Sequence, residues 1–97
     1  MKGGIFELTS PMPKTIICTT IACGYCVRAK RLLEAKQIPF EEVDVSYDVE
    51  TRLAMMEKSG GRMTVPQIFV GNMHIGGYDE LYELERSGKL DPLLSAA

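Results

Sequence analysis

The chain has 97 residues, of which 45% are hydrophobic and 25% charged, and its formal net charge at pH 7 is −2. This length suits a single globular domain with a modest core. The weakly acidic charge gives no general attraction to nucleic acid or anionic membranes, and no apolar run approaches the ~18 residues of a membrane span, so we expect neither partner.

Residues 1–13 precede the first predicted element and lack the pattern of a targeting signal. They contain one lysine, no arginine and the acidic Glu7, and the apolar pair Ile5-Phe6 is too short for the core of a signal peptide. We therefore expect a flexible N-terminal extension over residues 1–13, followed by one domain over residues 14–97.

The first half of this domain predicts a strand, a helix and a second strand. Residues 14–20 are rich in β-branched side chains and predict a buried strand. Residues from about 23 to 36 predict a helix whose apolar face includes Val27, Leu32 and Leu33. Pro39 prevents this helix from continuing, and the alternation in residues 40–45 predicts the second strand. Strands joined in this way are parallel, with a right-handed crossover.

The second half predicts a helix, a hairpin and a last helix. Residues from about 48 to 59 predict a helix with Val49, Leu53 and Met56 on its apolar face, ended by two glycines. Residues 67–70 and 73–75 flank Gly71-Asn72, a strong hairpin signal. A short helix then ends near residue 88, and residues 90–94 form a turn packed on the sheet. The inward side chains of that helix are expected to be Leu81, Tyr82 and Leu84. The sum is an α/β fold with a four-stranded mixed sheet and helices on both faces.

The chain has three cysteines, an odd number without the even framework of a disulfide-stapled secreted domain. We therefore expect a reducing compartment, the cytoplasm. In that setting, the segment Cys23-Gly24-Tyr25-Cys26 indicates a redox-active or metal-binding pair.

This segment directly follows the first predicted strand and opens the first predicted helix. A helix N-terminus carries about half a positive charge and several unpaired N–H groups, which stabilise the thiolate that attacks disulfides. We assign Cys23 as the nucleophile and the more buried Cys26 as the resolving thiol. The alternatives are a pair without function and half of a zinc site, for which only Cys18 and His74 remain as ligands. We expect both of these to be structural.

Four motifs occur in the order and spacing of dithiol glutaredoxins: residues 23–26, Thr64-Val65-Pro66, Gly76-Gly77-Tyr78-Asp79, and the segment 90–94. The chain resembles that family over about residues 14–95. The resemblance implies a thioredoxin fold with three to four helices flanking the sheet. It also implies glutathione-dependent thiol–disulfide oxidoreductase activity, in which glutathione is the co-substrate and mixed disulfides with glutathione or protein disulfides are reduced. The partners would be glutathionylated or disulfide-containing proteins, and the protein would be a monomer.

The resemblance also implies a glutathione-binding set. Val65, between Thr64 and a cis-Pro66, would pair with the backbone of glutathione. The start of a helix at Gly77, Tyr78 and Asp79 would meet a carboxylate through its N–H groups, with Asp79 capping the helix and meeting the ligand's ammonium. The remaining members of this set are Tyr25, which would shield the site, and Arg62, which would meet the other carboxylate. Three simpler interpretations stay open: a solvated Arg62, an Asp79 that only caps, and a trans-Pro66.

Two positions depart from the family pattern. Many members have proline where this chain has Gly24, and many carry lysine where it has Thr20. Some glutaredoxins with a small residue in place of that proline hold a [2Fe–2S] cluster between two protomers, ligated by the first cysteine and by glutathione. A glutathione-ligated cluster-binding dimer, with Cys23 as the metal ligand, is therefore the alternative function; without it we expect no metal.

Overall fold

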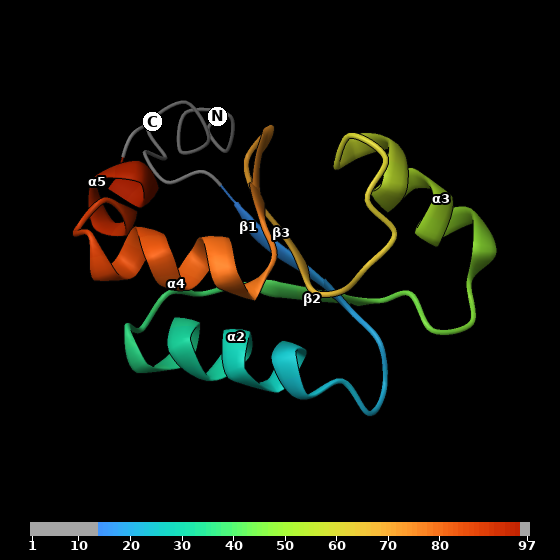
Figure 1. The fold of residues 1–97 in the computed structure, drawn as a ribbon, viewed down its shortest axis with the longest axis horizontal. Helices are drawn as coiled ribbons and strands as arrows, with labels where there is room; N and C mark the ends of the chain where they lie inside the picture. The colour runs from blue at the N-terminus through green and yellow to red at the C-terminus, as the bar shows by residue number, and fades with distance from the viewer. Residues whose placement is uncertain (1–13, 96–97) are drawn as a thin grey trace, which may run out of the picture.

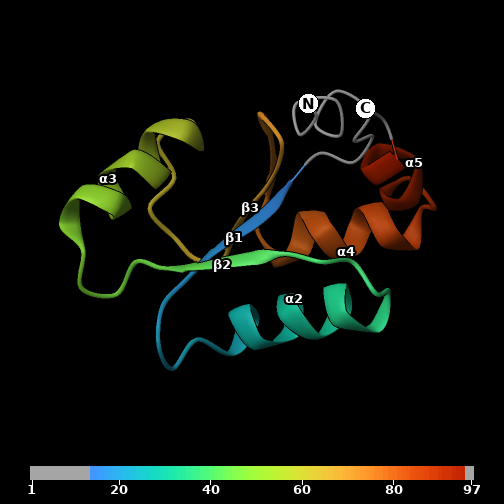
Figure 2. The same ribbon diagram turned by 180° about the vertical axis from the view of Figure 1, so that it is seen from behind.

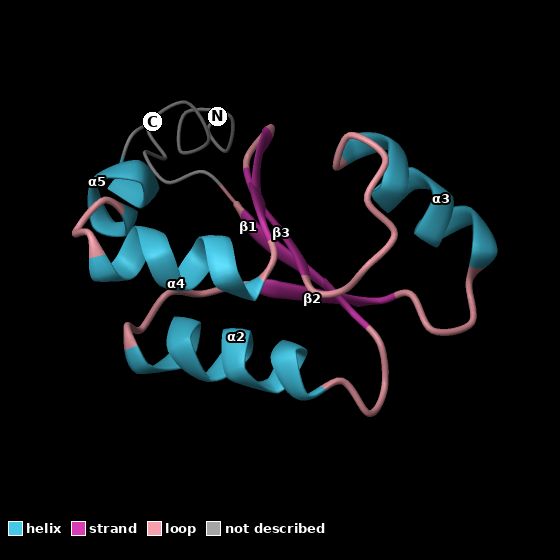
Figure 3. Cartoon of the chain, viewed as in Figure 1, coloured by secondary structure: helices cyan, strands magenta, loops and turns pink. Residues whose placement is uncertain are grey.

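The computed structural model describes residues 14–95, so the predicted extension over residues 1–13 lies outside the described part. The elements in chain order are β1 (Thr15–Thr19), α2 (Gly24–Ala35), β2 (Glu41–Asp44), α3 (Val49–Lys58), β3 (Gln67–Val70), β4 (Met73–Gly76), α4 (Tyr78–Arg86) and α5 (Leu90–Ser95). Figure 3 shows these elements by type. Within residues 14–95, no helix is long and apolar enough to cross a membrane.

The four strands form one mixed sheet in the order β2-β1-β3-β4. β1 pairs with β2 in parallel and with β3 antiparallel, and β3 pairs antiparallel with β4. Helices cover both faces: α2, α4 and α5 lie on one, and α3 lies on the other (Figures 1 and 2). This architecture confirms the expected thioredoxin fold, including the parallel pair on either side of α2.

Alternation along the central strands divides the core between the two faces. Ile17 and Ile68 are opposite each other in the register and belong to the larger cluster, with α2, α4 and α5. Their neighbours Cys18 and Phe69 point the other way, into a smaller cluster to which α3 contributes Met55. The final segment was predicted as a turn but is the short helix α5. It packs as predicted, because Leu90 and Leu94 are buried in the larger cluster.

Several predicted inward side chains are exposed instead. Val27 and Tyr82 each follow a buried residue, Cys26 and Leu81, and one residue of helix turns the side chain by about 100° away from the sheet. Tyr82 is accordingly 49% exposed. Leu32 and Leu84 are partly buried, as expected for the edges of a buried stripe.

The apolar face predicted for the helix over residues 48–59, which is α3, is also wrong. Val49 is 71% exposed and Leu53 is also exposed, whereas Met55 is the buried residue of α3. Met56 is only partly buried. The i, i+4 spacing of Val49 and Leu53 matched a helical stripe, but that stripe lies far around the helix from Met55.

Candidate active site

The thiol of Cys23 lies at the junction of β1 and α2, where it caps the helix. Its backbone is extended, and its sulfur accepts a hydrogen bond from the Cys26 N–H at 3.2 Å. The Cys23 Sγ–H also donates to the carbonyl oxygen of Val65 at 3.9 Å. Cys23 is half-buried, so its sulfur reaches solvent while remaining within the field of the helix N-terminus. This is the position expected for an attacking thiol.

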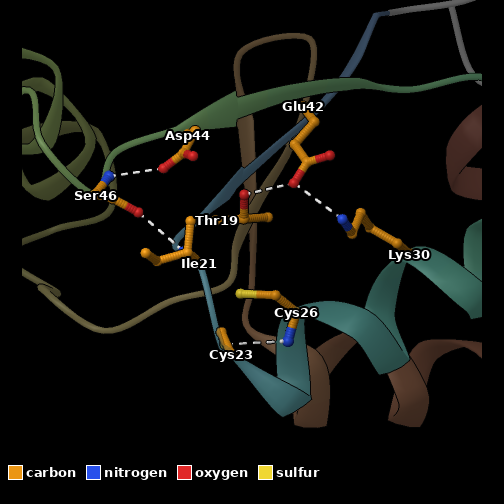
Figure 4. Close-up of polar contacts among 8 residues, drawn as sticks. All are labelled: Thr19, Ile21, Cys23, Cys26, Lys30, Glu42, Asp44 and Ser46. Atoms are coloured by element: carbon orange, nitrogen blue, oxygen red, sulfur yellow. Dashed lines mark hydrogen bonds and ion pairs between the residues drawn. The ribbon is translucent and has the colours of Figure 1, made fainter.

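The second thiol of the pair has different surroundings. Cys26 is 2% exposed, and burial, followed by the contact with Cys23, raises the pKa of its thiol to about 12. The Thr20 backbone and Lys30 act in the opposite direction but more weakly than burial. Cys26 is therefore a protonated thiol at neutral pH, held one helical turn behind Cys23 (Figure 4). All three cysteines are free.

Beside Cys23 lies a pocket that we call the Val65 pocket. It is bounded by the segment before β3, by the start of α4 and by one side chain of α2. The Val65–Pro66 peptide bond in its wall is cis, as the resemblance implied. The pocket brings together every residue of the predicted glutathione-binding set, and adds one: its lining is Tyr25, Arg62, Thr64, Val65, Pro66, Gly77, Tyr78, Asp79 and Glu80.

The added residue, Glu80, changes the expected chemistry of the helix start. Its Oε1 accepts a hydrogen bond from the Gly77 N–H at 2.6 Å and lies 3.5 Å from Arg62 Nη1. The Gly77 N–H is therefore the main reason that the pKa of the Glu80 carboxyl is lowered. The expectation that Asp79 caps α4 is wrong, because the cap is made by Glu80 and Asp79 is exposed. The Gly-x-x-Glu spacing of a capping box was the sequence signal for it.

Part of the helix start still faces the pocket with its donors. The first intrahelical hydrogen bond of α4 runs from the Leu81 N–H to the Gly77 carbonyl. Tyr78 and Asp79 precede it and line the pocket, and N–H groups in the first turn of a helix have no intrahelical acceptor and suit an anion. Gly77 allows this wall to form, since a Cβ there would lie 3.2 Å from the Pro66 carbonyl oxygen.

Aromatic side chains form one rim of the Val65 pocket. The ring centroids of Tyr25 and Tyr78 are 6.0 Å apart, and those of Tyr78 and Tyr82 are also 6.0 Å apart. The Arg28 guanidinium lies over the Tyr25 ring, 5.4 Å from its centroid. Tyr82 thus belongs to a surface row of tyrosines beside the pocket and not to the core.

A second cavity lies on the other side of the thiol pair, and we call it the Glu42 cavity. Cys23, Cys26 and Glu42 line it together with Thr20. Glu42 accepts a hydrogen bond from Thr19 Oγ1 at 2.7 Å and pairs with Lys30 at 3.0 Å (Figure 4). The position at which many family members carry lysine, Thr20, therefore lines this cavity and not the Val65 pocket.

The remaining candidate ligands do not join the thiol pair. Cys18 is buried in the smaller cluster, and His74 lies on β4 beside Gln67. Across residues 14–95, no three His, Cys, Asp or Glu side chains are grouped so that they could hold a metal ion. The described residues therefore offer no zinc-binding set.

Known proteins share both the sequence and the fold. The glutaredoxin family model matches residues 15–75. Glutaredoxin 1 of Rickettsia typhi is 51% identical over 80 residues, which cover 81% of this chain and 77% of that protein. The solution structure of glutaredoxin from Brucella melitensis has a TM-score of 0.79 and 50% identity, covering 90% of this chain and 94% of that one. A buckwheat glutaredoxin–glutathione complex has a TM-score of 0.76 and 29% identity, covering 88% and 83%. With its Cys23–Cys26 pair, the chain therefore belongs to the glutaredoxin family of thiol oxidoreductases.

Proposed function

We propose that the protein reduces mixed disulfides between proteins and glutathione, and also protein disulfides, with glutathione as co-substrate. One observation carries the proposal: the residues expected to bind glutathione line a single pocket whose Val65 carbonyl contacts the Cys23 sulfur. The buckwheat relative, solved as a glutathione complex, supports the same ligand. We place the activity in the cytoplasm, a reducing compartment that supplies glutathione.

The pocket offers complementary groups for each part of glutathione, which is an extended peptide-like molecule with two carboxylates and an ammonium. The Thr64–Val65 backbone pairs with the backbone of the ligand. The Tyr78 and Asp79 N–H groups receive one carboxylate, Arg62 receives the other, and the Asp79 carboxylate meets the ammonium. Glu80 already pairs with Arg62 at 3.5 Å, so Arg62 is shared between Glu80 and the ligand.

The first step is attack by the Cys23 thiolate on the glutathione sulfur of a mixed disulfide. A bond forms between Cys23 Sγ and that sulfur, the bond to the protein sulfur breaks, and the departing protein thiolate takes a proton from water. The helix start stabilises the attacking thiolate through the Cys26 N–H, 3.2 Å away. A second glutathione then attacks the glutathione sulfur on Cys23, giving glutathione disulfide and free Cys23.

Reduction of a protein disulfide ends differently. The Cys23 thiolate attacks one sulfur of the substrate disulfide, and the other substrate sulfur leaves and takes a proton from water. Cys26 then attacks Cys23, which forms the Cys23–Cys26 disulfide, later reduced by two molecules of glutathione, and releases the bonded substrate sulfur as a second thiol. Cys26 must lose its proton to do so, and its raised pKa makes this the demanding part of the route. Reduction of a mixed disulfide with glutathione does not need Cys26, because a second glutathione releases Cys23. The intramolecular step in protein disulfide reduction does need Cys26.

Replacing each cysteine in turn tests the proposal. Cys23→Ser should abolish all exchange, whereas Cys26→Ser should keep reduction of a glutathionylated peptide and lose most reduction of a protein disulfide. Both rates are measured with glutathione and a coupled assay for glutathione disulfide. Cys18→Ser is the matched control. Cys18 lies in the smaller core cluster with Met55 and Phe69, so its replacement should leave both rates unchanged. Activity in Cys23→Ser would remove Cys23 from the nucleophile role.

Gly24 favours a second candidate, the glutathione-ligated [2Fe–2S] dimer. A Cβ built at Gly24 would have no heavy atom within 4 Å apart from the adjacent residues and the backbone of its own helix, so it would leave room beside Cys23 for a second protomer. Cys26 is buried and protonated, which leaves Cys23 as the thiolate this chain can offer. Two Cys23 thiolates and two glutathione thiolates would supply the usual four sulfur ligands, and the cluster would add iron–sulfur storage or transfer to the thiol chemistry.

A further inference from the structure

A buried amide lies directly behind the Val65 pocket. Gln67, the first residue of β3, is 0% exposed and does not line the pocket. Its Nε2 donates to the Thr64 carbonyl oxygen at 3.0 Å and lies 3.3 Å from Thr64 Oγ1. Its Oε1 lies 2.7 Å from His74 Nε2. A polar side chain buried so completely needs hydrogen-bond partners. The hydrogen bonds of the Gln67 side chain connect His74 on β4 to Thr64, in the segment that carries Val65.

The hydrogen bond between Gln67 and the Thr64 carbonyl fixes which atom donates in the contact between His74 and Gln67. The Thr64 carbonyl can only accept, so the amide nitrogen of Gln67 must face it and the amide oxygen must face His74. The Nε2 of His74 therefore carries the hydrogen and donates to Gln67. Burial and the nearby Arg62 lower the pKa of His74, while Glu80 acts in the opposite direction. The lowered pKa favours the neutral ring, whose one N–H is then used by the contact with Gln67.

The linked hydrogen bonds of His74, Gln67 and Thr64 fix the orientation of the Thr64–Val65 peptide group. In the Thr64–Val65 peptide, which is trans, the C=O and N–H point in opposite directions. Because Gln67 holds the Thr64 carbonyl inward, the Val65 N–H is turned away from Gln67 and toward the pocket side. We propose that Gln67, itself held by His74, is a positioning residue that aims the Val65 N–H at the peptide backbone of glutathione. The inference rests on the function proposed above and adds the device that gives the pocket its preference for glutathione.

Other side-chain hydrogen bonds hold the same segment before Thr64, and beyond it the Cys23 thiol contacts the Val65 carbonyl oxygen at 3.9 Å. Ser59 Oγ donates to the Arg62 carbonyl at 3.0 Å, and Arg52 Nη2 donates to the Met63 carbonyl at 3.1 Å. Both anchors are on the α3 side and reach no farther than Met63. Gln67 is the side chain that contacts Thr64, so removing its amide should free the Thr64–Val65 peptide while leaving the rest of the segment attached.

The test compares two substrates that differ only in the group bonded to the peptide sulfur: one peptide carrying glutathione and the same peptide carrying cysteine. Gln67→Met keeps the length of the side chain without its amide. It should lower kcat/KM for the glutathionylated peptide about tenfold, mainly by raising KM, and change kcat/KM for the cysteinylated peptide less than about twofold. The cysteinylated peptide lacks the flanking backbone that Val65 would bind, so it reports on Cys23 alone.

Two variants of His74 test its hydrogen bond to Gln67 while leaving the buried Gln67 side chain unchanged. His74→Phe keeps the ring next to Phe69, whose centroid is 5.1 Å away, but removes the N–H; we expect a loss of roughly threefold, confined to the glutathionylated peptide. His74→Gln keeps a donor at the same distance from the backbone and should restore the wild-type ratio. Ile75→Val, in the larger cluster on the same strand, is the control for a general loss of packing.

Equal losses on both peptides, or losses no larger than that of Ile75→Val, would overturn the inference, as would His74→Gln behaving like His74→Phe. These outcomes differ from failure of the proposed function itself. In that case the wild type would show no preference for the glutathionylated peptide, or Cys23→Ser would remain active.

Discussion

At the scale of single residues, the site depends on the sulfurs of Cys23 and Cys26, which lie one helical turn apart and differ in burial. Cys23 has the helix start and solvent, while Cys26 has the packed side chains of α2 and the sheet. Burial favours the neutral thiol of Cys26, because a thiolate there would lose its hydration without gaining a full partner. Folding and proton binding at Cys26 are therefore linked.

The sign of that linkage gives a prediction for stability against pH. Cys26 has a pKa of about 12 in the folded state and about 9 when unfolded, so the unfolded chain loses its proton first as the pH rises. The stabilisation is complete below about pH 9 and is lost between about pH 9 and 12. The free energy of unfolding of the reduced protein should fall by roughly 1–2 kcal/mol more than that of Cys26→Ser between pH 8 and 10.5. Denaturant titrations under reducing conditions measure this difference. Parallel curves would show that Cys26 is not linked to folding.

At the start of α4, one carboxylate, that of Glu80, caps the helix, and another, that of Asp79, lines the Val65 pocket without capping. Glu80→Ala removes the acceptor of the Gly77 N–H and should cost about 1 kcal/mol of unfolding free energy, as the loss of a helix cap does. Asp79→Ala should cost less than about 0.5 kcal/mol, because Asp79 makes no cap, yet it should weaken glutathione use. Urea unfolding measures the first effect and kcat/KM the second. Equal destabilisation by the two variants would contradict this division of roles.

At the scale of elements, α2, α3 and α4 end in the same way. In each, the first residue beyond the cap has positive φ, and it and the next residue donate to carbonyls of the last turn. Glycine fills this position after α3 and α4, but Gln37, with φ of 59°, fills it after α2. The Gln37 N–H donates to the Glu34 carbonyl and the Ile38 N–H to the Leu33 carbonyl, both at 2.9 Å. A side chain in the left-handed region costs roughly 1–2 kcal/mol relative to glycine.

Gln37→Gly should therefore stabilise the protein. Relief of the left-handed conformation is partly offset by the greater freedom of glycine in the unfolded chain, which leaves a gain of about 0.5–1 kcal/mol. Gln37→Ala is the matched control: it removes the same side chain but keeps a Cβ at a φ of 59°, so it should bring no relief of the left-handed conformation. Thermal and urea unfolding of both variants measure the effect. A Gln37→Gly protein no more stable than the wild type would show that the conformation is not strained.

The sequence predicted the order of elements because each has a local signature: β-branched strands, glycines that end α3 and α4, and Gly71-Asn72 between β3 and β4. The resemblance to glutaredoxins grouped the residues that line the Val65 pocket. Composition could not have grouped them, because they are far apart in the sequence and only the fold brings them together. The sequence failed where the choice was between neighbouring positions on a helix. Val49 and Leu53 fitted the helical period as well as Met55 does, and only the packing against the sheet decides which stripe is buried. Glu80 was missed because glycine is a weak capping signal.

At the scale of the whole molecule, the reactive thiol lies at an edge between two cavities. The Val65 pocket adjoins it on one side and the Glu42 cavity on the other, and Gly24 leaves the surface above it open. A small thiol substrate needs only the Val65 pocket. A second protomer, in contrast, needs that open surface, because the two Cys23 sulfurs must approach one cluster. If the cluster-bound dimer forms, we therefore expect its assembly to depend on the residue at position 24.

Under the two proposed functions, we expect the residue at position 24 to favour either a monomeric reductase or a cluster-bound dimer. Proline at this position, the first residue of α2, would suit the helix, and its Cβ would meet no atom within 4 Å outside the adjacent residues and the helix backbone. It would, however, fix φ near −65° and remove a backbone N–H beside Cys23, which makes the loop less able to turn the sulfur outward. Anaerobic reconstitution of the wild type with iron, sulfide and glutathione should give a coloured dimer, at least in part.

Gly24→Pro should lose the colour and the dimer while keeping the reduction of a glutathionylated peptide; visible absorption and size-exclusion chromatography follow the two effects together. Gly24→Ala is the matched control, since it fills the same open space but keeps the N–H, and it should retain part of the colour. Omitting glutathione should prevent the dimer in every variant, because Cys23 alone gives two protomers only two of the four sulfur ligands. A wild type that stays colourless and monomeric with glutathione present would eliminate the cluster function. The peptide-reductase activity of Cys23 would stand unaffected, since it requires neither the second protomer nor the iron.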